Sequence, residues 1–345
     1  MRHRKHIPKT LWVANMAPAG ARPYPGFCAS KNVEGEKAAG DSRGQRPLKR
    51  PRAVTGFRVC TFLCTLLLCL TLNAQEKIWE GTGCRDRKVT LTEYLPQGEP
   101  RAAVVVCPGG SYHWLDVDAE GTKVGQWLAG EGIAAYVLQY RVAGKFEFAA
   151  KYRTFVRGHR YPDMIEDLQR AIQLVRERYS GPVGAMGFSA GGHLVMLSAE
   201  FFGTNFLARY GIEPEVSLRP DFVAPIYPAV TQNAPLVHKR SRLGLLGEWT
   251  VLKQEMRDSL SLEKHVKADT PPVFLLSCRD DKVVDYRNSV LLDSALTASG
   301  VPHLYTQYAT GGHGFGADKA KQNEETSQWQ AAFIEWLKAV LPNNE

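Results

Sequence analysis

The chain has 345 residues with 43 Lys and Arg against 35 Asp and Glu, which gives a net charge of +8. The charge is uneven, because residues 1–74 hold 13 basic and 3 acidic residues and residues 75–345 carry a net charge of −2. A nucleic-acid-binding face would place its positive charge on the folded part, so the composition argues against nucleic acid as a partner.

Residues 1–53 are rich in Pro, Gly, Lys and Arg and show no sustained apolar periodicity, so we expect a disordered basic leader. In residues 54–74, Arg58 precedes a 13-residue apolar stretch and small residues follow it up to Ala74. This order is typical of a secretory signal peptide, with cleavage expected after Ala74. We therefore expect a secreted or periplasmic protein.

The apolar stretch is shorter than the roughly 20 residues that span a bilayer, so no stable membrane insertion is expected after cleavage. A signal that starts more than 50 residues into a chain is unusual. One hypothesis is that translation starts near Val54 and that the basic leader belongs to the upstream sequence. N-terminal sequencing of the natural protein would refute this hypothesis by finding leader residues.

Residues 75–345 contain three cysteines, Cys84, Cys107 and Cys278, so at most one disulfide can form there. Cys107 and Cys278 end apolar runs, which favours buried small side chains over disulfide partners. No Cys or His spacing is typical of a zinc site, and we expect no metal.

The same 271 residues have the size of one α/β domain without internal repeats. Six short apolar runs predict strands at 102–107, 133–140, 182–188, 221–227, 271–278 and 303–309. Continuous apolar runs mean that both faces of the sheet are covered, which predicts a mainly parallel sheet between helices. Helices are expected at 162–179, directly after residue 189, and from about Thr326, and a short cap at 229–270.

The most informative motif is GFSAGGH, Gly187 to His193, which follows a predicted strand and begins a predicted helix. A serine on such a sharp turn is the nucleophile elbow, and Ser189 is the candidate nucleophile. The turn leaves no room for side chains two residues before and after the serine, where Gly187 and Gly191 stand. Small Ala190 and Gly192 allow the helix to pack closely. The motif alone also occurs in ordinary glycine-rich turns, so its context decides.

Before the motif, CPGGSYHWL follows the strand at 102–107. The N–H groups of Gly110 and Ser111, together with that of Ala190, are candidates for the oxyanion hole of an acyl-transfer reaction. Tyr112 and Trp114 in the same loop are candidate contacts for the substrate, with the hydrophobic core as the alternative place for both rings.

After the motif, RDDKVVD follows the strand at 271–278 and TGGHGFG follows the strand at 303–309. Sites in open α/β sheets form at the carboxyl ends of strands, which makes Asp281 the candidate acid and His313 the candidate base. The chain order Ser, Asp, His is the order of this type of triad. Asp280 and Asp285 are the alternative acids, with Asp280 expected to bond loop amides, and His193 is expected to brace the elbow from the helix.

The segments PGGSYHWL, YVLQYRV, YPDMIEDLQRAIQLVRERY, GFSAGGHL, TPPVFLLSCRDDKVV and GGHGFG resemble α/β-hydrolase esterases grouped with bacterial acetyl-xylan and feruloyl esterases. The resemblance covers almost all of residues 75–345 and implies the α/β-hydrolase fold. It also implies a carboxyl-ester hydrolase without metal or organic cofactor, with nucleophile Ser189, acid Asp281 and base His313. One difference is Asp285, which stands where such proteins often have proline.

The expected function is removal of small acyl groups, acetyl first, from a polysaccharide or its oligosaccharides, so the expected partner is an acylated carbohydrate. A serine peptidase of the same fold is one alternative, although it would normally bring a separate β-rich domain. A non-catalytic binding protein that keeps the fold is the other. The sugar, the acyl group and the oligomeric state stay open at this stage.

Overall fold

The computed structural model describes residues 74–149, 158–250 and 253–341. The predicted leader, residues 1–53, and the predicted signal peptide up to residue 73 lie outside these ranges and stay predictions. Within the described ranges, no helix is both long enough and apolar enough to cross a membrane.

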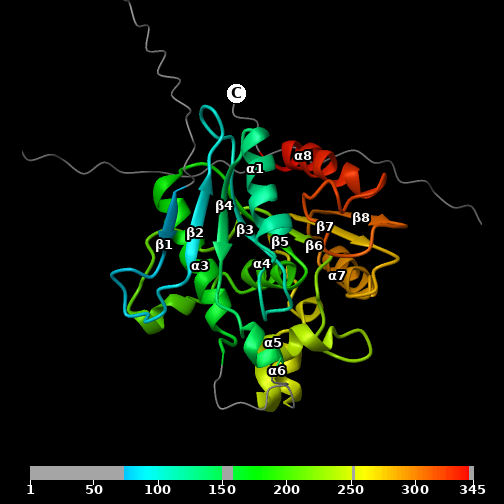
Figure 1. The fold of residues 1–345 in the computed structure, drawn as a ribbon, viewed down its shortest axis with the longest axis horizontal. Coiled ribbons are helices and arrows are strands. Elements are labelled where there is room, and N and C mark those ends of the chain that lie inside the picture. The colour runs from blue at the N-terminus through cyan, green and yellow to red at the C-terminus, as the bar shows by residue number, and fades with distance from the viewer. Residues whose placement is uncertain (1–73, 150–157, 251–252, 342–345) are drawn as a thin grey trace, which may run out of the picture. The chain divides into compact units, whose positions relative to one another are not determined.

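The described part of the chain contains one eight-stranded sheet in the order β1-β2-β4-β3-β5-β6-β7-β8 (Figure 1). The strands are β1 (Gln75–Lys77), β2 (Thr90–Tyr94), β3 (Ala103–Cys107), β4 (Ala134–Gln139), β5 (Val183–Phe188), β6 (Val223–Ile226), β7 (Val273–Cys278) and β8 (His303–Tyr308). β2 is antiparallel to both of its neighbours, and all pairs from β4 through β8 are parallel. The mainly parallel sheet that the apolar runs predict is therefore confirmed.

All six predicted strands form, with ends within two residues of the prediction. The two that the sequence did not predict, β1 and β2, lie together at one edge of the sheet. β1 has only three residues, and in β2 the buried Leu91 lies between the half-buried Thr90 and Thr92. Neither strand contains the continuous apolar run that marks a strand covered on both faces.

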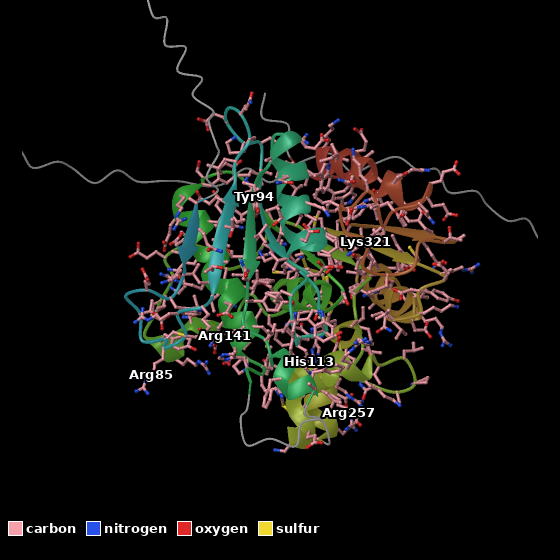
Figure 2. The ribbon with its side chains drawn as sticks, in the orientation of Figure 1. Arg85, Tyr94, His113, Arg141, Arg257 and Lys321 are labelled. Carbon is pink, nitrogen blue, oxygen red and sulfur yellow. The ribbon has the colours of Figure 1, made fainter. Side chains whose placement is uncertain are left out.

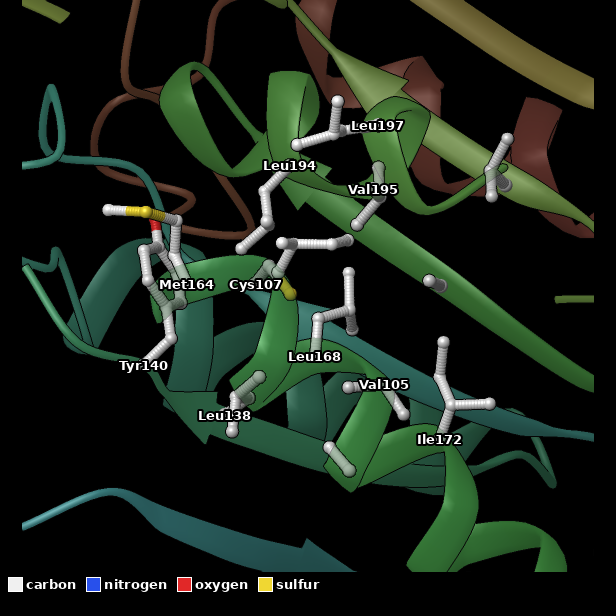
Figure 3. Packing of buried hydrophobic residues seen from close by; sticks show 14 of the residues in the cluster. Val105, Cys107, Leu138, Tyr140, Met164, Leu168, Ile172, Leu194, Val195 and Leu197 are labelled. Atoms are coloured by element: carbon white, nitrogen blue, oxygen red, sulfur yellow. The ribbon is translucent and has the colours of Figure 1, made fainter. Parts of the chain in front are cut away.

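Helices cover both faces of the sheet (Figure 1). The α-helices of the described part of the chain are α1 (Lys123–Gly130), α2 (Lys145–Ala149), α3 (Asp163–Arg178), α4 (Ala190–Glu200), α5 (Lys239–Thr250), α6 (Gln254–Ser259), α7 (Arg287–Ala298) and α8 (Trp329–Val340). Successive side chains of a strand point to opposite faces, so Val105 and Cys107 pack with α3 and α4 (Figure 3), whereas Val104 and Val106 pack with α1 and α8.

The helix predicted at 162–179 forms as α3, and on its buried face Ile165, Leu168, Ile172 and Val175 have no solvent exposure. Burial of each such side chain contributes about 1.5–3 kcal/mol, so this face holds α3 to the sheet. Cys107 and Cys278 are buried free thiols, as predicted, and Cys84 is also free.

The predicted cap, residues 229–270, contains α5, α6 and a short 3-10 turn at Leu262–Lys264. α5 packs directly on the loop after β3, near His113 (Figure 2). A Cβ on Gly244 would lie 2.5 Å from the Ser111 carbonyl oxygen and 2.8 Å from the His113 ring. Only a glycine allows this close approach between the cap and the loop.

His193 braces the elbow from the first turns of α4, as predicted. Its ring is fully buried, with Nε2 at 2.9 Å from the Leu260 carbonyl oxygen and Nδ1 at 2.8 Å from the Tyr112 hydroxyl. Because a carbonyl oxygen only accepts hydrogen bonds, Nε2 carries the hydrogen and Nδ1 accepts the Tyr112 O–H. One neutral imidazole thus joins α4, the loop after β3 and the cap.

Acidification should destabilise the protein through this histidine. Burial lowers the pKa of His193 to about 4, so between pH 6.5 and 4 the unfolded chain binds a proton that the folded protein does not. The stability due to the neutral ring is fully present above pH 6.5 and is lost as the pH falls toward 4. Between about pH 7.5 and about pH 5 we expect a loss on the order of 2 kcal/mol from His193 alone.

Urea unfolding of the wild type and of His193→Gln at both pH values measures this loss. Glutamine keeps one donor and one acceptor but does not titrate, so the variant should lose clearly less stability on acidification than the wild type. Burial also lowers the pKa of His238 to about 4, and this residue adds a loss of the same sign to both proteins. Equal losses in the two proteins would contradict the assignment to His193.

Candidate active site

Ser189 lies in the sharp turn between β5 and α4, with φ 53° and ψ −114°. A side-chain-bearing residue in this region of backbone space costs on the order of 1–3 kcal/mol, so the surrounding structure must impose it. A Cβ on Gly187 would lie 2.1 Å from the Gly191 carbonyl oxygen, and one on Gly191 would lie 2.0 Å from the Cys107 carbonyl oxygen. Both glycines are needed because the turn leaves no room for a side chain at either position, as predicted.

The structure brings Ser189, His313 and Asp281 together. His313 Nε2 lies 2.9 Å from Ser189 Oγ, and His313 Nδ1 lies 2.6 Å from Asp281 Oδ2. Because the carboxylate accepts the Nδ1 hydrogen, Nε2 has a free lone pair and accepts the serine O–H. This is the tautomer that a histidine base needs in order to remove a proton from serine.

The three neighbouring acids have separate partners. Asp281 Oδ1 accepts the N–H groups of Val283 at 2.7 Å and Val284 at 3.0 Å, which leaves Oδ2 for His313. Asp280 accepts the N–H groups of Gly311 and Gly312, which confirms its expected contact with loop amides. Asp285 binds the Arg287 backbone N–H and guanidinium. Of the three, only Asp281 contacts the His313 ring among the described residues.

The loop after β3 places its backbone against the serine. A Cβ on Gly109 would lie 2.9 Å from the Ser189 Cβ, and Gly110 and Ser111 both have positive φ values, 135° and 57°. Within the described part of the chain, the N–H groups of Gly110, Ser111 and Ala190 donate to no protein acceptor. The three N–H groups stay the candidate oxyanion donors.

The prediction for Tyr112 as a substrate contact is wrong. Its ring is 1% exposed, and its hydroxyl bonds the His193 ring, so the residue belongs to the core, and no face is open to a sugar. Trp114 is half-buried beside Gly110, and its ring packs at 5.5 Å from the Phe148 ring. Trp114 stays a candidate substrate contact.

Two buried residues of this site, Glu120 and Tyr227, were not predicted from the sequence. Glu120 Oε2 accepts the Gly109 N–H at 2.7 Å, and Oε1 accepts the Tyr227 hydroxyl at 2.8 Å. The Tyr227 ring centre lies 4.6 Å from that of His313. Glu120 occurs in the acidic stretch DVDAEGT, which resembles an exposed loop, and no motif distinguishes it.

Asp281 also borders a cavity of about 500 Å³, whose wall includes His238, Arg279 and Lys282. Burial keeps His238 neutral by lowering its pKa to about 4. Across the described ranges, no group of three or more His, Cys, Asp or Glu side chains is arranged to hold a metal ion.

Comparison with protein families gives a match to BD-FAE over residues 93–296, which is more than half of the chain. The chain belongs to the BD-FAE family. The match includes Ser189 and Asp281 and ends before His313.

Two curated relatives are similar to this BD-FAE chain. The acetylxylan esterase of Xylanibacter ruminicola is 28% identical over 260 residues, which are 73% of this chain and 49% of that protein. Endo-1,4-beta-xylanase B of Butyrivibrio fibrisolvens is 30% identical over 220 residues, which are 62% of this chain and 32% of that protein. This chain therefore spans about half or less of the length of these relatives.

Among solved structures, the acetyl ester-xyloside bifunctional hydrolase from Caldicellulosiruptor lactoaceticus is similar with a TM-score of 0.66 and 28% identity. The alignment covers 78% of this chain and 96% of that chain. Together with the strand order, this likeness confirms the predicted α/β-hydrolase fold.

Substitution of each of the three acids in this BD-FAE protein tests which one orients His313. Asp281→Asn should lower ester turnover by about 10³- to 10⁴-fold, because an amide favours the wrong tautomer of His313 and cannot stabilise its cation. Asp280→Asn and Asp285→Asn should each lower turnover by less than about tenfold, since they disturb loop contacts alone. Steady-state rates on 4-nitrophenyl acetate measure all three, and a larger loss at either neighbour would reverse the assignment.

Proposed function

We propose that this protein is a secreted serine carboxyl-ester hydrolase that removes small acyl groups, acetyl first, from a polysaccharide or its oligosaccharides. The observation that carries the proposal is the continuous hydrogen-bond chain from Asp281 through His313 to Ser189, which lies at a strained strand-to-helix turn. In this proposal Ser189 is the nucleophile, His313 the general base and Asp281 the residue that orients the base.

The geometry supports a two-step reaction. Ser189 Oγ attacks the ester carbonyl carbon while its proton moves to His313 Nε2, and the Asp281 carboxylate stabilises the imidazolium that forms. The carbonyl oxygen becomes an oxyanion that accepts hydrogen bonds from the candidate backbone donors. Each such donor is worth roughly 3–4 kcal/mol of barrier, and the candidates are the N–H groups of Gly110, Ser111 and Ala190.

Collapse of this intermediate breaks the bond to the alcohol oxygen, which takes the proton from His313 and leaves as a sugar hydroxyl. The acyl group then remains on Ser189 Oγ. A water molecule attacks the acyl carbon with His313 as base, and the second collapse returns the proton to Ser189 and releases the carboxylic acid. The two acyl-transfer steps balance without a redox step or an organic cofactor.

The relatives support the substrate class, because their names refer to acetylxylan, xylan and acetyl ester-xyloside substrates. The half-buried Trp114 ring beside Gly110 is the candidate sugar contact. The signal-like pattern in residues 54–74 supports action outside the cytoplasm, where polysaccharides are found.

Ser189→Ala tests the nucleophile. The variant should lose at least about 10⁴-fold in ester turnover while its thermal midpoint stays close to that of the wild type, because only Oγ is removed. Reaction with a fluorophosphonate probe should disappear with the activity. Retention of more than a tenth of wild-type turnover would refute the triad.

The substrate proposal is tested by acyl chain length. Rates on 4-nitrophenyl esters should fall from acetate to octanoate, acetate should be released from acetylated xylan oligosaccharides, and peptide anilides should not be cleaved. Rates that rise steadily to octanoate, with no acetate from the xylan oligosaccharides, would contradict the proposal.

A further inference from the structure

Between β3 and α1, the chain forms a π-helical turn, Asp118–Thr122, that buries the carboxyl group of Glu120. π-helical turns are rare in proteins, but those that exist lie frequently at functional sites. The additional residue in such a turn redirects a side chain. Here Glu120 is 3% exposed and its neighbours Ala119 and Gly121 are also buried. A buried carboxyl group is costly unless donors surround it, so its partners decide its role.

The first partner is the loop that lies on the nucleophile. Glu120 Oε2 accepts the Gly109 N–H at 2.7 Å. A Cβ on Gly109 would lie 2.6 Å from Oε2 and 2.9 Å from the Ser189 Cβ, so Gly109 is in close contact with both Glu120 and the serine. The hydrogen bond therefore holds the segment that carries the oxyanion donors Gly110 and Ser111.

The second partner is the segment that carries the base. Glu120 Oε1 accepts the Tyr227 hydroxyl at 2.8 Å, and the Tyr227 oxygen in turn accepts the Gly316 N–H at 3.1 Å. Gly316 lies three residues after His313, and the Tyr227 ring packs against the His313 ring. One carboxyl group thus connects the oxyanion loop and the histidine loop.

The hydrogen-bond directions fit an ionised carboxylate. Because the Tyr227 oxygen already accepts from Gly316, its own hydrogen needs an acceptor, and Glu120 Oε1 is in place. Both carboxyl oxygens of Glu120 then accept hydrogen bonds, which a protonated acid cannot do equally well. Burial raises the pKa of Glu120 above its ordinary value, and the nearby His313, the Tyr227 hydroxyl and the Gly109 N–H offset only part of this rise.

We propose that Glu120 is a positioning residue that fixes the oxyanion loop relative to His313 and supplies a second negative charge, besides Asp281, that stabilises the protonated His313. This inference rests on the proposed esterase function.

The ionisable groups that interact with His313 come from separate elements. They are Asp281 after β7, Glu120 in the π-helical turn, Tyr227 after β6 and His238 before α5. Asp116 interacts with Glu120.

Glu120→Gln is the principal variant. An amide has one acceptor and one donor, so it cannot accept both the Gly109 N–H and the Tyr227 O–H, and it carries no charge. We expect kcat on 4-nitrophenyl acetate to fall by about 10- to 100-fold with KM within about threefold, because the loss affects the transition state more than binding.

The pH profile separates the charge from a purely structural role. Loss of a nearby negative charge favours neutral imidazole, so the acid limb of kcat/KM in Glu120→Gln should move to lower pH. Tyr227→Phe is the comparison variant, since it removes the link to Gly316 and keeps the ring and the Glu120 carboxyl group. It should lower kcat by about three- to tenfold and move the acid limb less than Glu120→Gln does.

An NMR titration of the His313 ring in the inactive Ser189→Ala background requires no activity. Addition of Glu120→Gln should lower the His313 pKa, and addition of Tyr227→Phe should lower it less. An absence of wild-type esterase activity would refute the proposed function, while the titration would still test whether Glu120 supplies a negative charge to His313.

An unmoved His313 titration in the Glu120→Gln variant would overturn the inference. Wild-type kcat in both Glu120→Gln and Tyr227→Phe would also overturn it. If Glu120→Gln does not fold, Tyr227→Phe decides: wild-type kcat in that variant would also overturn it.

Discussion

The strained turn at Ser189 is the constraint on which the rest of this structure depends. The turn exists because two glycines allow the backbone of β5, α4 and the loop after β3 to approach to distances that no side chain permits. It places the serine at the carboxyl edge of the sheet. Every partner must therefore come from the carboxyl end of a nearby strand: Gly110 and Ser111 after β3, Tyr227 after β6, Asp281 after β7 and His313 after β8.

These loops are held to one another by buried polar groups rather than by apolar contacts alone. His193 joins the elbow helix to the loop after β3 and to the cap, and Glu120 joins the same loop to Tyr227 and Gly316. Since a buried polar group without a partner costs about 1–3 kcal/mol, each bond specifies one relative position of the loops it connects. Loops that carry catalytic groups need such supports to hold one geometry.

The sequence was sufficient for features that are local or continuous. Six strands, the glycines beside Ser189 and the separate tasks of Asp280 and Asp281 follow from runs, spacings and turn chemistry. Other features depend on contacts between residues far apart in the sequence. Tyr112 points into the core, where its hydroxyl bonds His193, and Glu120 meets Tyr227 more than 100 residues away. β1 and β2 were missed because neither of them contains a continuous apolar run.

The central claim is that Ser189 carries the acyl group between the two steps of ester hydrolysis. Rapid acid quenching of the protein during turnover of 4-nitrophenyl acetate, followed by peptide mass spectrometry, tests it directly. The account predicts an acetylated peptide with the modification on Ser189, and none in a Ser189→Ala variant treated in the same way. Continued turnover with no acetyl group on Ser189, or with the acetyl group on another residue, would contradict the account.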